Sequence, residues 1–199
     1  GLEPGGKAAE FSANAKFILL EKDYKTYEKI EIRGAMKQQA KALLSKAEER
    51  SKVEAKYKEL FKYKRIQWIL AALYRVGHSF EEFAATLFDA PVPKEFASNQ
   101  EYADEYKFKL QDKAFVIEEK AVAAYVVAYE KAKEAKVQNE WTQLTLESLN
   151  KYRGAEYPVL KKTKNPLNFE PFSSGAPIIH KPKVKVVAQE PEPESTSAS

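Results

Sequence analysis

The sequence contains no cysteine, and this absence removes several kinds of chemistry at once. Without thiols the chain has no disulfide, no thiolate zinc site and no cysteine nucleophile. Histidine is almost as scarce, because His78 and His180 are the only two. Neither has a second histidine at a metal-ligand spacing, or a glutamate three residues before it as a di-iron site would require. We therefore predict that the protein binds no metal.

Glycine is also scarce, with seven residues in the whole chain, which leaves little material for loops that hold phosphates or dinucleotides. No glycine-rich phosphate loop, nucleophile elbow or kinase-type run is present. Adjacent acids such as Glu118 and Glu119 point about 100° apart on a helix, so they do not form a catalytic pair. We predict that the protein is not an enzyme, has no catalytic residue and uses no cofactor or small-molecule substrate.

No apolar run approaches the roughly 20 residues that a membrane-spanning helix needs, so no transmembrane segment is predicted. The chain is instead rich in lysine, glutamate and alanine, with 44% hydrophobic and 31% charged residues. This composition is typical of amphipathic helices with a solvated face. A length of 199 residues is enough for one helical domain and a tail.

Apolar residues recur at three- and four-residue steps along most of the first 157 residues, which predicts an all-α domain. The first helix, 7–22, is expected to face the core with Ala8, Phe11, Ala15, Ile18 and Leu19. The next expected helices are 24–47, with a break near Gly34, and 53–76, as one helix or two. A short helix over 80–88 is expected to end before Pro91 and Pro93. The last two are 102–135, capped by Ser98 or Asn99, and 139–152, which ends near Gly154.

A possible repeat lies within this domain. The large apolar residue Leu73 is followed by the small pair Val76 and Gly77 and then by the aromatic Phe80. Trp141 lies 68 residues after Leu73, which is twice the 34-residue period of a tetratricopeptide repeat. Gly77 would let a neighbouring backbone approach closely. The spacing predicts a tetratricopeptide-like α-solenoid with altered loops. Its signature residues are Leu73, Val76, Gly77, Phe80, Ala121, Tyr125, Ala128, Trp141 and Leu144.

The composition changes after Tyr157, because seven of the ten prolines lie at or after Pro158. Residues 189–199 are rich in proline, glutamate and serine, which is typical of disorder. We predict a helical domain over 1–157 and a largely disordered tail over 158–199. Apolar residues alternate with lysines between 178 and 187, so this segment is either a linker or a strand that adds to a sheet of another protein.

One part of the chain resembles a particular group of proteins. The residues that carry the likeness are Trp68, Ala71, Ala72, Leu73, Tyr74, Arg75, Gly77, Phe83, Ala84, Leu87, Ala90, Pro91, Pro93, Glu118, Lys120, Ala121, Tyr125, Asn139, Glu140, Trp141 and Thr142. This stretch resembles the tetratricopeptide proteins of deltaproteobacterial cell envelopes, which include a component of the myxobacterial gliding motility machinery. The resemblance implies a periplasmic or envelope-associated scaffold that binds other proteins of a complex, with any export signal lying outside this sequence.

Two kinds of partner are left open. Aromatic and basic residues that do not fit the core stripe are candidates for protein binding, although they could equally cap or bridge neighbouring helices. They are Tyr63, Tyr74, Arg75 and Tyr129. The alternative is a polyanion, either nucleic acid or an anionic membrane surface, held by the basic residues of 56–65 among Tyr57, Phe61 and Tyr63. Acids mixed through the same helices make nucleic acid the weaker prediction.

Overall fold

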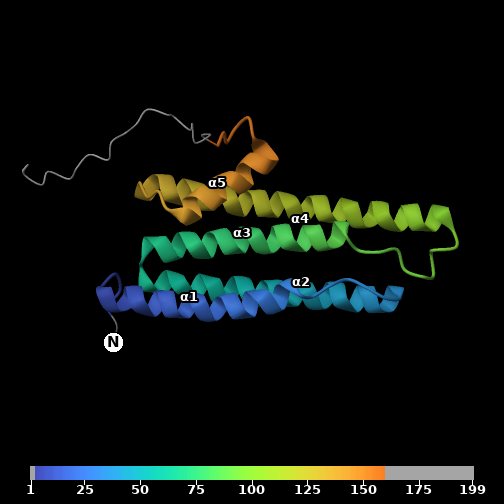
Figure 1. Ribbon diagram of the computed structural model, residues 1–199, viewed down its shortest axis with the longest axis horizontal. Helices are drawn as coiled ribbons and strands as arrows, with labels where there is room; N and C mark the ends of the chain where they lie inside the picture. The colour runs from blue at the N-terminus through green and yellow to red at the C-terminus, as the bar shows by residue number, and fades with distance from the viewer. Residues whose placement is uncertain (1–2, 160–199) are drawn as a thin grey trace, which may run out of the picture. The chain divides into compact units, whose positions relative to one another are not determined.

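The computed structural model describes residues 3–159, and in this part of the chain every regular element is helical (Figure 1). The elements are α1 (Lys7–Glu28), α2 (Met36–Lys58), the short 3-10 helix η1 (Glu59–Tyr63), α3 (Ile66–Phe88), α4 (Gln100–Ala135) and α5 (Glu140–Arg153). The all-α prediction is confirmed for these residues. The predicted tail from residue 160 onward, with its strand-like segment 178–187 and His180, lies outside them.

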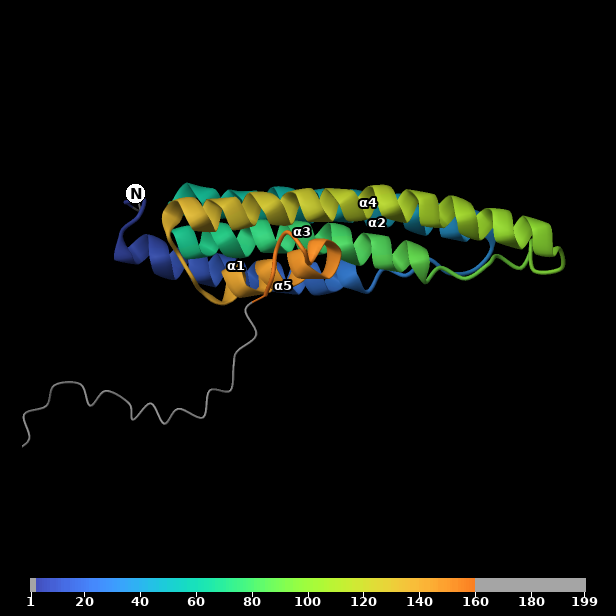
Figure 2. The same cartoon turned by 90° about the horizontal axis from the view of Figure 1, so that it is seen from above.

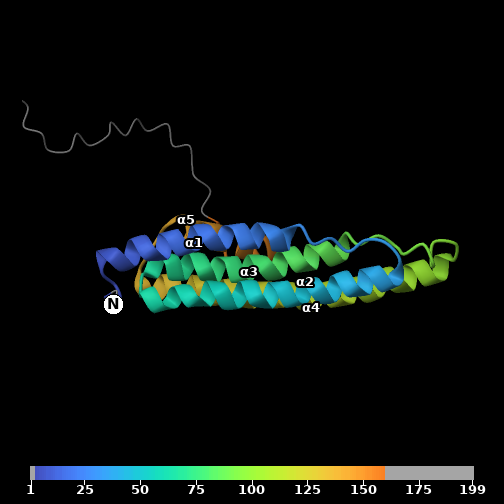
Figure 3. The ribbon, with the colours of Figure 1, turned by 90° about the horizontal axis from the view of Figure 1, so that it is seen from below.

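α3 is the central helix of the bundle, because it contacts α1, α2, α4 and α5. Figure 1 shows α1 and α2 on one side of α3, and α4 and α5 on the other, and in the view from above α4 overlies α2 while α5 overlies α1 (Figure 2). Seen from below, α1 and α2 run along the length of α3 (Figure 3). A helix that is apolar on most of its circumference belongs in such a position, and α3 has ten buried residues.

The boundaries between α1, α2 and α3 follow local backbone signals. Gly34 lies between α1 and α2 with a φ of +94°, in the left-handed region that favours glycine, so the predicted break is confirmed. α2 continues into η1, and the chain then turns at Lys64, whose φ is +51°. The apolar stretch 53–76 is therefore divided among the end of α2, η1 and the first part of α3.

The proline and asparagine signals are also confirmed. α3 ends at Phe88, shortly before Pro91 and Pro93. Asn99 caps α4, because its side-chain oxygen accepts a hydrogen bond from the first turn, and Asn139 caps α5 in the same way. Three boundaries differ from the expectation: α1 continues beyond residue 22 to Glu28, α2 spans the expected gap between 47 and 53, and α3 spans the expected gap between 76 and 80.

The helix positions do not follow a 34-residue repeat of helix pairs. Successive α-helices begin at residues 7, 36, 66, 100 and 140, so each stretch of about this length holds one helix. A tetratricopeptide repeat places two helices in 34 residues. The signature residues lie on three successive α-helices: Leu73, Val76, Gly77 and Phe80 on α3, Ala121, Tyr125 and Ala128 on α4, and Trp141 and Leu144 on α5.

The core face predicted for α1 is wrong. Of the expected residues, Phe11 is 73%, Ile18 55% and Leu19 57% exposed. The face that packs on the bundle consists of Ala9, Ala13, Phe17, Leu20, Tyr24 and Tyr27. Both faces of α1 carry apolar side chains, so periodicity alone does not select one of them. The tyrosines decide the orientation, because their hydroxyl groups find partners on other helices.

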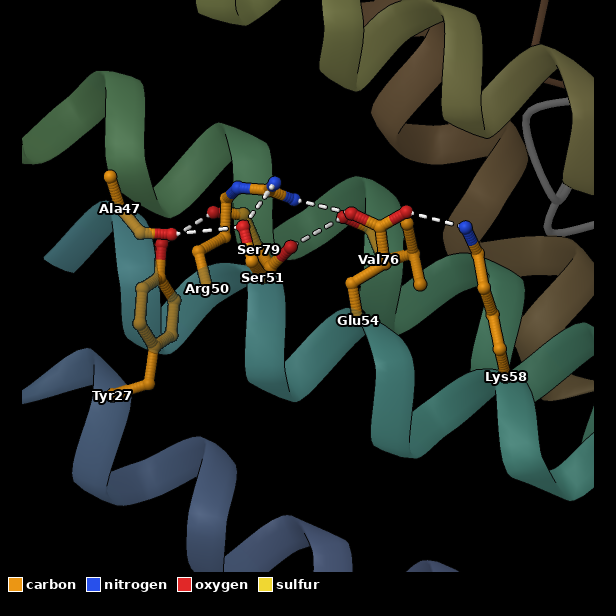
Figure 4. Close-up of polar contacts among 8 residues, drawn as sticks. All are labelled: Tyr27, Ala47, Arg50, Ser51, Glu54, Lys58, Val76 and Ser79. Carbon is orange, nitrogen blue, oxygen red and sulfur yellow. Dashed lines mark hydrogen bonds and ion pairs between the residues drawn. The ribbon is translucent and has the colours of Figure 1, made fainter.

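Buried tyrosines form much of the core. Tyr24, Tyr27, Tyr57 and Tyr125 are each at most 1% exposed. The Tyr27 hydroxyl donates to the carbonyl of Ser79 at 2.6 Å, as Figure 4 shows. Tyrosine contributes a large apolar ring to a core, but its hydroxyl must find a hydrogen bond there. Among residues 3–159, only the Tyr152 hydroxyl is buried without one.

Candidate functional site

Of the four residues predicted to bind a partner, Tyr74 is buried and Arg75 is partly buried. Tyr74 is 7% exposed, and its ring lies against those of His78, Tyr125 and Trp141. Arg75 is held in an ion pair with Glu21. Tyr74 therefore has little surface to offer a partner, and Arg75 already has a carboxylate partner in Glu21, so partner binding by either residue stays a prediction. The reading that they bridge neighbouring helices, which the sequence left open, fits the structure.

The other two predicted residues, Tyr63 and Tyr129, are half-buried. Tyr63 packs at the edge of the core cluster and lies under the Lys62 ammonium, 5.2 Å from its ring centroid. Tyr129 makes an edge-to-face contact with Tyr157 at 5.5 Å. The structure does not bring the four residues together on one surface.

Arg75 joins α3 to α1 through Glu21. Its Nε donates to Glu21 Oε1 at 2.9 Å, and the Tyr57 hydroxyl donates to the same oxygen at 2.6 Å. The guanidinium also lies over the Tyr24 ring, 5.0 Å from its centroid. Burial alone would lower the pKa of Arg75, but the Glu21 carboxylate outweighs it and raises the pKa. This cluster clamps α1, α2 and α3 together and offers no reactive group.

A second cluster joins α3, α4 and α5 through Glu81. The carboxylate accepts hydrogen bonds from the Tyr125 hydroxyl and the Lys151 ammonium, both at 2.6 Å. Burial would raise the pKa of Glu81, but the bonds from Lys151 and Tyr125 lower it below its usual value. The carboxylate is thus kept ionised by its partners, which suits a structural role.

His78 lies between these clusters, with its Nδ1 2.5 Å from the Tyr24 hydroxyl. Burial, and then the nearby Arg75 charge, lower the pKa of His78 below its usual 6.5. We expect an NMR titration to place the His78 pKa below 6.5. Since the unfolded chain takes up the proton first, this histidine should leave stability unchanged above pH 6.5 and reduce it as the pH falls below that value.

With two histidines in the chain, a His180→Gln variant assigns the remaining imidazole signal to His78. A His78 pKa at or above 6.5 would contradict the buried, neutral ring.

The basic cluster expected to bind polyanions is largely neutralised. Lys56 pairs with Asp23 at 2.7 Å, and Lys58 pairs with Glu54 at 2.6 Å, the second of which Figure 4 shows. Arg65 pairs with Glu10. Residues 3–159 contain 27 basic and 25 acidic residues, against 33 and 29 in the full chain. Such a balanced domain is poorly suited to neutralising a row of phosphates.

The feature that sequence reasoning missed is an apolar groove of about 410 Å³ along the bundle. α2 and α4 both pack on α3, but no Cα atom of α2 comes within 8 Å of one in α4. Side chains of α3 form the floor between them, and those of α2 and α4 form the walls. The lining residues are Leu43, Phe83, Leu87, Asp112, Lys113, Val116 and Ile117.

Val116 is the most informative member of this lining, because it is 60% exposed although it is apolar. A signal for it exists in the sequence. The run 114–117 is apolar at four successive positions, which is more than one helical turn. At least one of the four must then point away from the core, and here Val116 points away from it while Ala114 is buried.

The described residues 3–159 hold no group of three or more acidic or histidine side chains placed to bind a metal ion. None of their helices is both long and apolar enough to cross a membrane. Comparisons with protein-family models, with curated proteins and with solved structures find no match to this chain.

Proposed function

We propose that this protein is a noncatalytic scaffold that binds a helical segment of another protein in the groove between α2 and α4. The observation that carries the proposal is the groove itself, which is apolar, open to solvent and lined by the exposed Val116. The Glu21 and Glu81 clusters support a structural role for the rest of the bundle, since each carboxylate accepts hydrogen bonds from a cation and a tyrosine.

A helix is the best fit for this groove. Amphipathic helices bind hydrophobic grooves through apolar residues spaced three and four apart. A volume of about 410 Å³ suits two or three large side chains from such a helix. Asp112 and Lys113 give the lining one charge of each sign. These charges would favour one direction of the bound helix over the other.

The proposed setting is a bacterial envelope assembly, in the periplasm or at the envelope, and its sole support is the resemblance of residues 68–141 to envelope tetratricopeptide proteins. A role in gliding motility belongs to the same proposal. From the tetratricopeptide likeness the proposal takes only the way of binding, in which a helical surface holds segments of other proteins. A 34-residue period is not needed for that mode.

The groove can be tested with a pair of matched substitutions on α4. Val116 and Val127 are 60% and 56% exposed, but only Val116 lines the groove. In crosslinking pull-downs from an envelope fraction, Val116→Glu should reduce recovery of the bound proteins at least tenfold, since a carboxylate in an apolar contact costs roughly 1.4 kcal/mol or more. Val127→Glu should recover them as the original protein does.

Equal recovery by both variants would exclude the groove as the binding surface. Recovery of nucleic acid alone, lost from every variant at moderate salt, would instead favour the polyanion alternative.

A further inference from the structure

α1 has a second apolar face that the bundle leaves uncovered. Phe11 is 73% and Ile18 55% exposed, and Ala8 and Ala15 are also exposed. The four residues follow steps of three, four and three, which are the a and d positions of a heptad. We call Ala8, Phe11, Ala15 and Ile18 the α1 seam. Leu19, 57% exposed, extends it on one side.

The seam has no role in holding the bundle together. The opposite face of α1, with Phe17, Leu20 and Tyr24, already packs on the core. A soluble helix normally has one apolar stripe, and a second contiguous one marks an interaction surface. The seam is on α1, whereas the groove is formed by α2, α3 and α4, so the two surfaces are separate.

We propose that the α1 seam pairs with the same seam of a second copy, with the two α1 helices antiparallel. In an antiparallel pair each a position packs against a d position of the other helix. Phe11 then lies opposite Ala15 of the second copy, and Ile18 lies opposite Ala8 of the second copy. Every one of the four layers combines a large side chain with an alanine, so the seam is complementary to itself, as a twofold interface requires.

The parallel arrangement is disfavoured by both size and charge. In register, Phe11 would meet Phe11 and Ala15 would meet Ala15, which alternates crowded layers with empty ones. The next a position is Lys22, and a parallel pair would place the two lysine ammonium groups against each other. In the antiparallel pair Lys22 lies beyond the last layer. The charge and the alternation of sizes therefore favour the same arrangement.

The expected dimer is weak. The seam covers residues 8–19, which is about 17 Å of helix, and two such surfaces bury less area than a standard stable interface. Dimerisation would place two grooves in one assembly, which suits a scaffold. The pairing itself does not depend on the groove binding anything, so either proposal can fail without the other.

The absence of cysteine makes the register directly testable in the full chain. Ala8→Cys and Ile18→Cys are prepared as separate proteins and oxidised alone and as an equal mixture. The antiparallel pair brings position 8 of one copy to position 18 of the other, within disulfide reach, and keeps the other three layers. A disulfide-linked dimer should then form at least tenfold more in the mixture than in either protein alone.

Dimers that form equally in each single variant would overturn the antiparallel arrangement, and no dimer in any sample would overturn the pairing. Phe11→Glu tests the surface by sedimentation equilibrium and should weaken association at least tenfold. Phe108→Glu is the matched control, because Phe108 is 64% exposed on α4, outside the seam. Equal association of both variants would contradict the proposal. So would binding of the full chain to anionic phospholipid vesicles through Phe11 without any dimer in solution.

Discussion

Gly77→Val should lower the free energy of unfolding by about 3 kcal/mol, because α3 and α4 leave no room for a side chain at this position. A Cβ atom at residue 77 would lie 2.7 Å from ring atoms Cδ1 and Cε1 of Tyr125. The ring cannot easily move, since Tyr125 is fully buried and its hydroxyl is bound to Glu81. Valine has a better helix propensity than glycine by less than 1 kcal/mol, so the steric effect decides the sign.

Urea denaturation followed by circular dichroism measures this change. Ala123→Val, at an exposed position of α4, is the control and should alter stability by less than about 0.5 kcal/mol. If the Gly77 variant is as stable as the control, the close packing of α3 on α4 is not as described.

Glu21→Ala should be similarly harmful, at about 3 kcal/mol, because it leaves the Arg75 guanidinium without a carboxylate. The two side chains are only 21% and 23% exposed, so water cannot replace the lost partner fully. The Tyr57 hydroxyl loses its acceptor in the same change. Thermal or urea unfolding of the variant measures the effect.

Asp23→Ala is the matched control for this substitution. Asp23 lies two residues further along α1 and also pairs with a cation of another element, Lys56, but both side chains are nearly half exposed. Surface ion pairs of this kind contribute about 0.2 to 1 kcal/mol. Equal losses for Glu21→Ala and Asp23→Ala would show that the Glu21 pair is not a buried clamp. The double variant Glu21→Ala, Arg75→Met should recover part of the stability, since it removes the unpaired charge.

Most of the helices could be predicted from the sequence because their signals are local. Prolines after Phe88, asparagine caps before α4 and α5, and a left-handed Gly34 each act within a few residues of the boundary that they set. The orientation of α1 could not be predicted in this way. It depends on hydroxyl partners such as His78 and Ser79, more than 50 residues away along the chain.

The repeat interpretation was partly informative. Gly77 and Tyr125 were both identified as repeat residues, and the structure places them in contact. The predicted close approach at Gly77 is found, although a tyrosine ring rather than a backbone makes it. The error lay in the period, because residue order along one helix does not reveal how long that helix is. The groove was missed for a related reason, since it requires knowing that α2 and α4 are both neighbours of α3 and not of each other.

The central position of α3 limits how this architecture can change size. A stack of repeats grows by adding units at its ends, because each unit contacts only its neighbours. Here α3 already contacts four other helices, so a further helix could pack only on the outer surface of the bundle, where a bound partner would also lie. Insertions can instead lengthen the bundle along its axis, provided that whole helical turns are added to adjacent helices together. Duplication of a helix pair, the usual route to a longer solenoid, would not extend this fold.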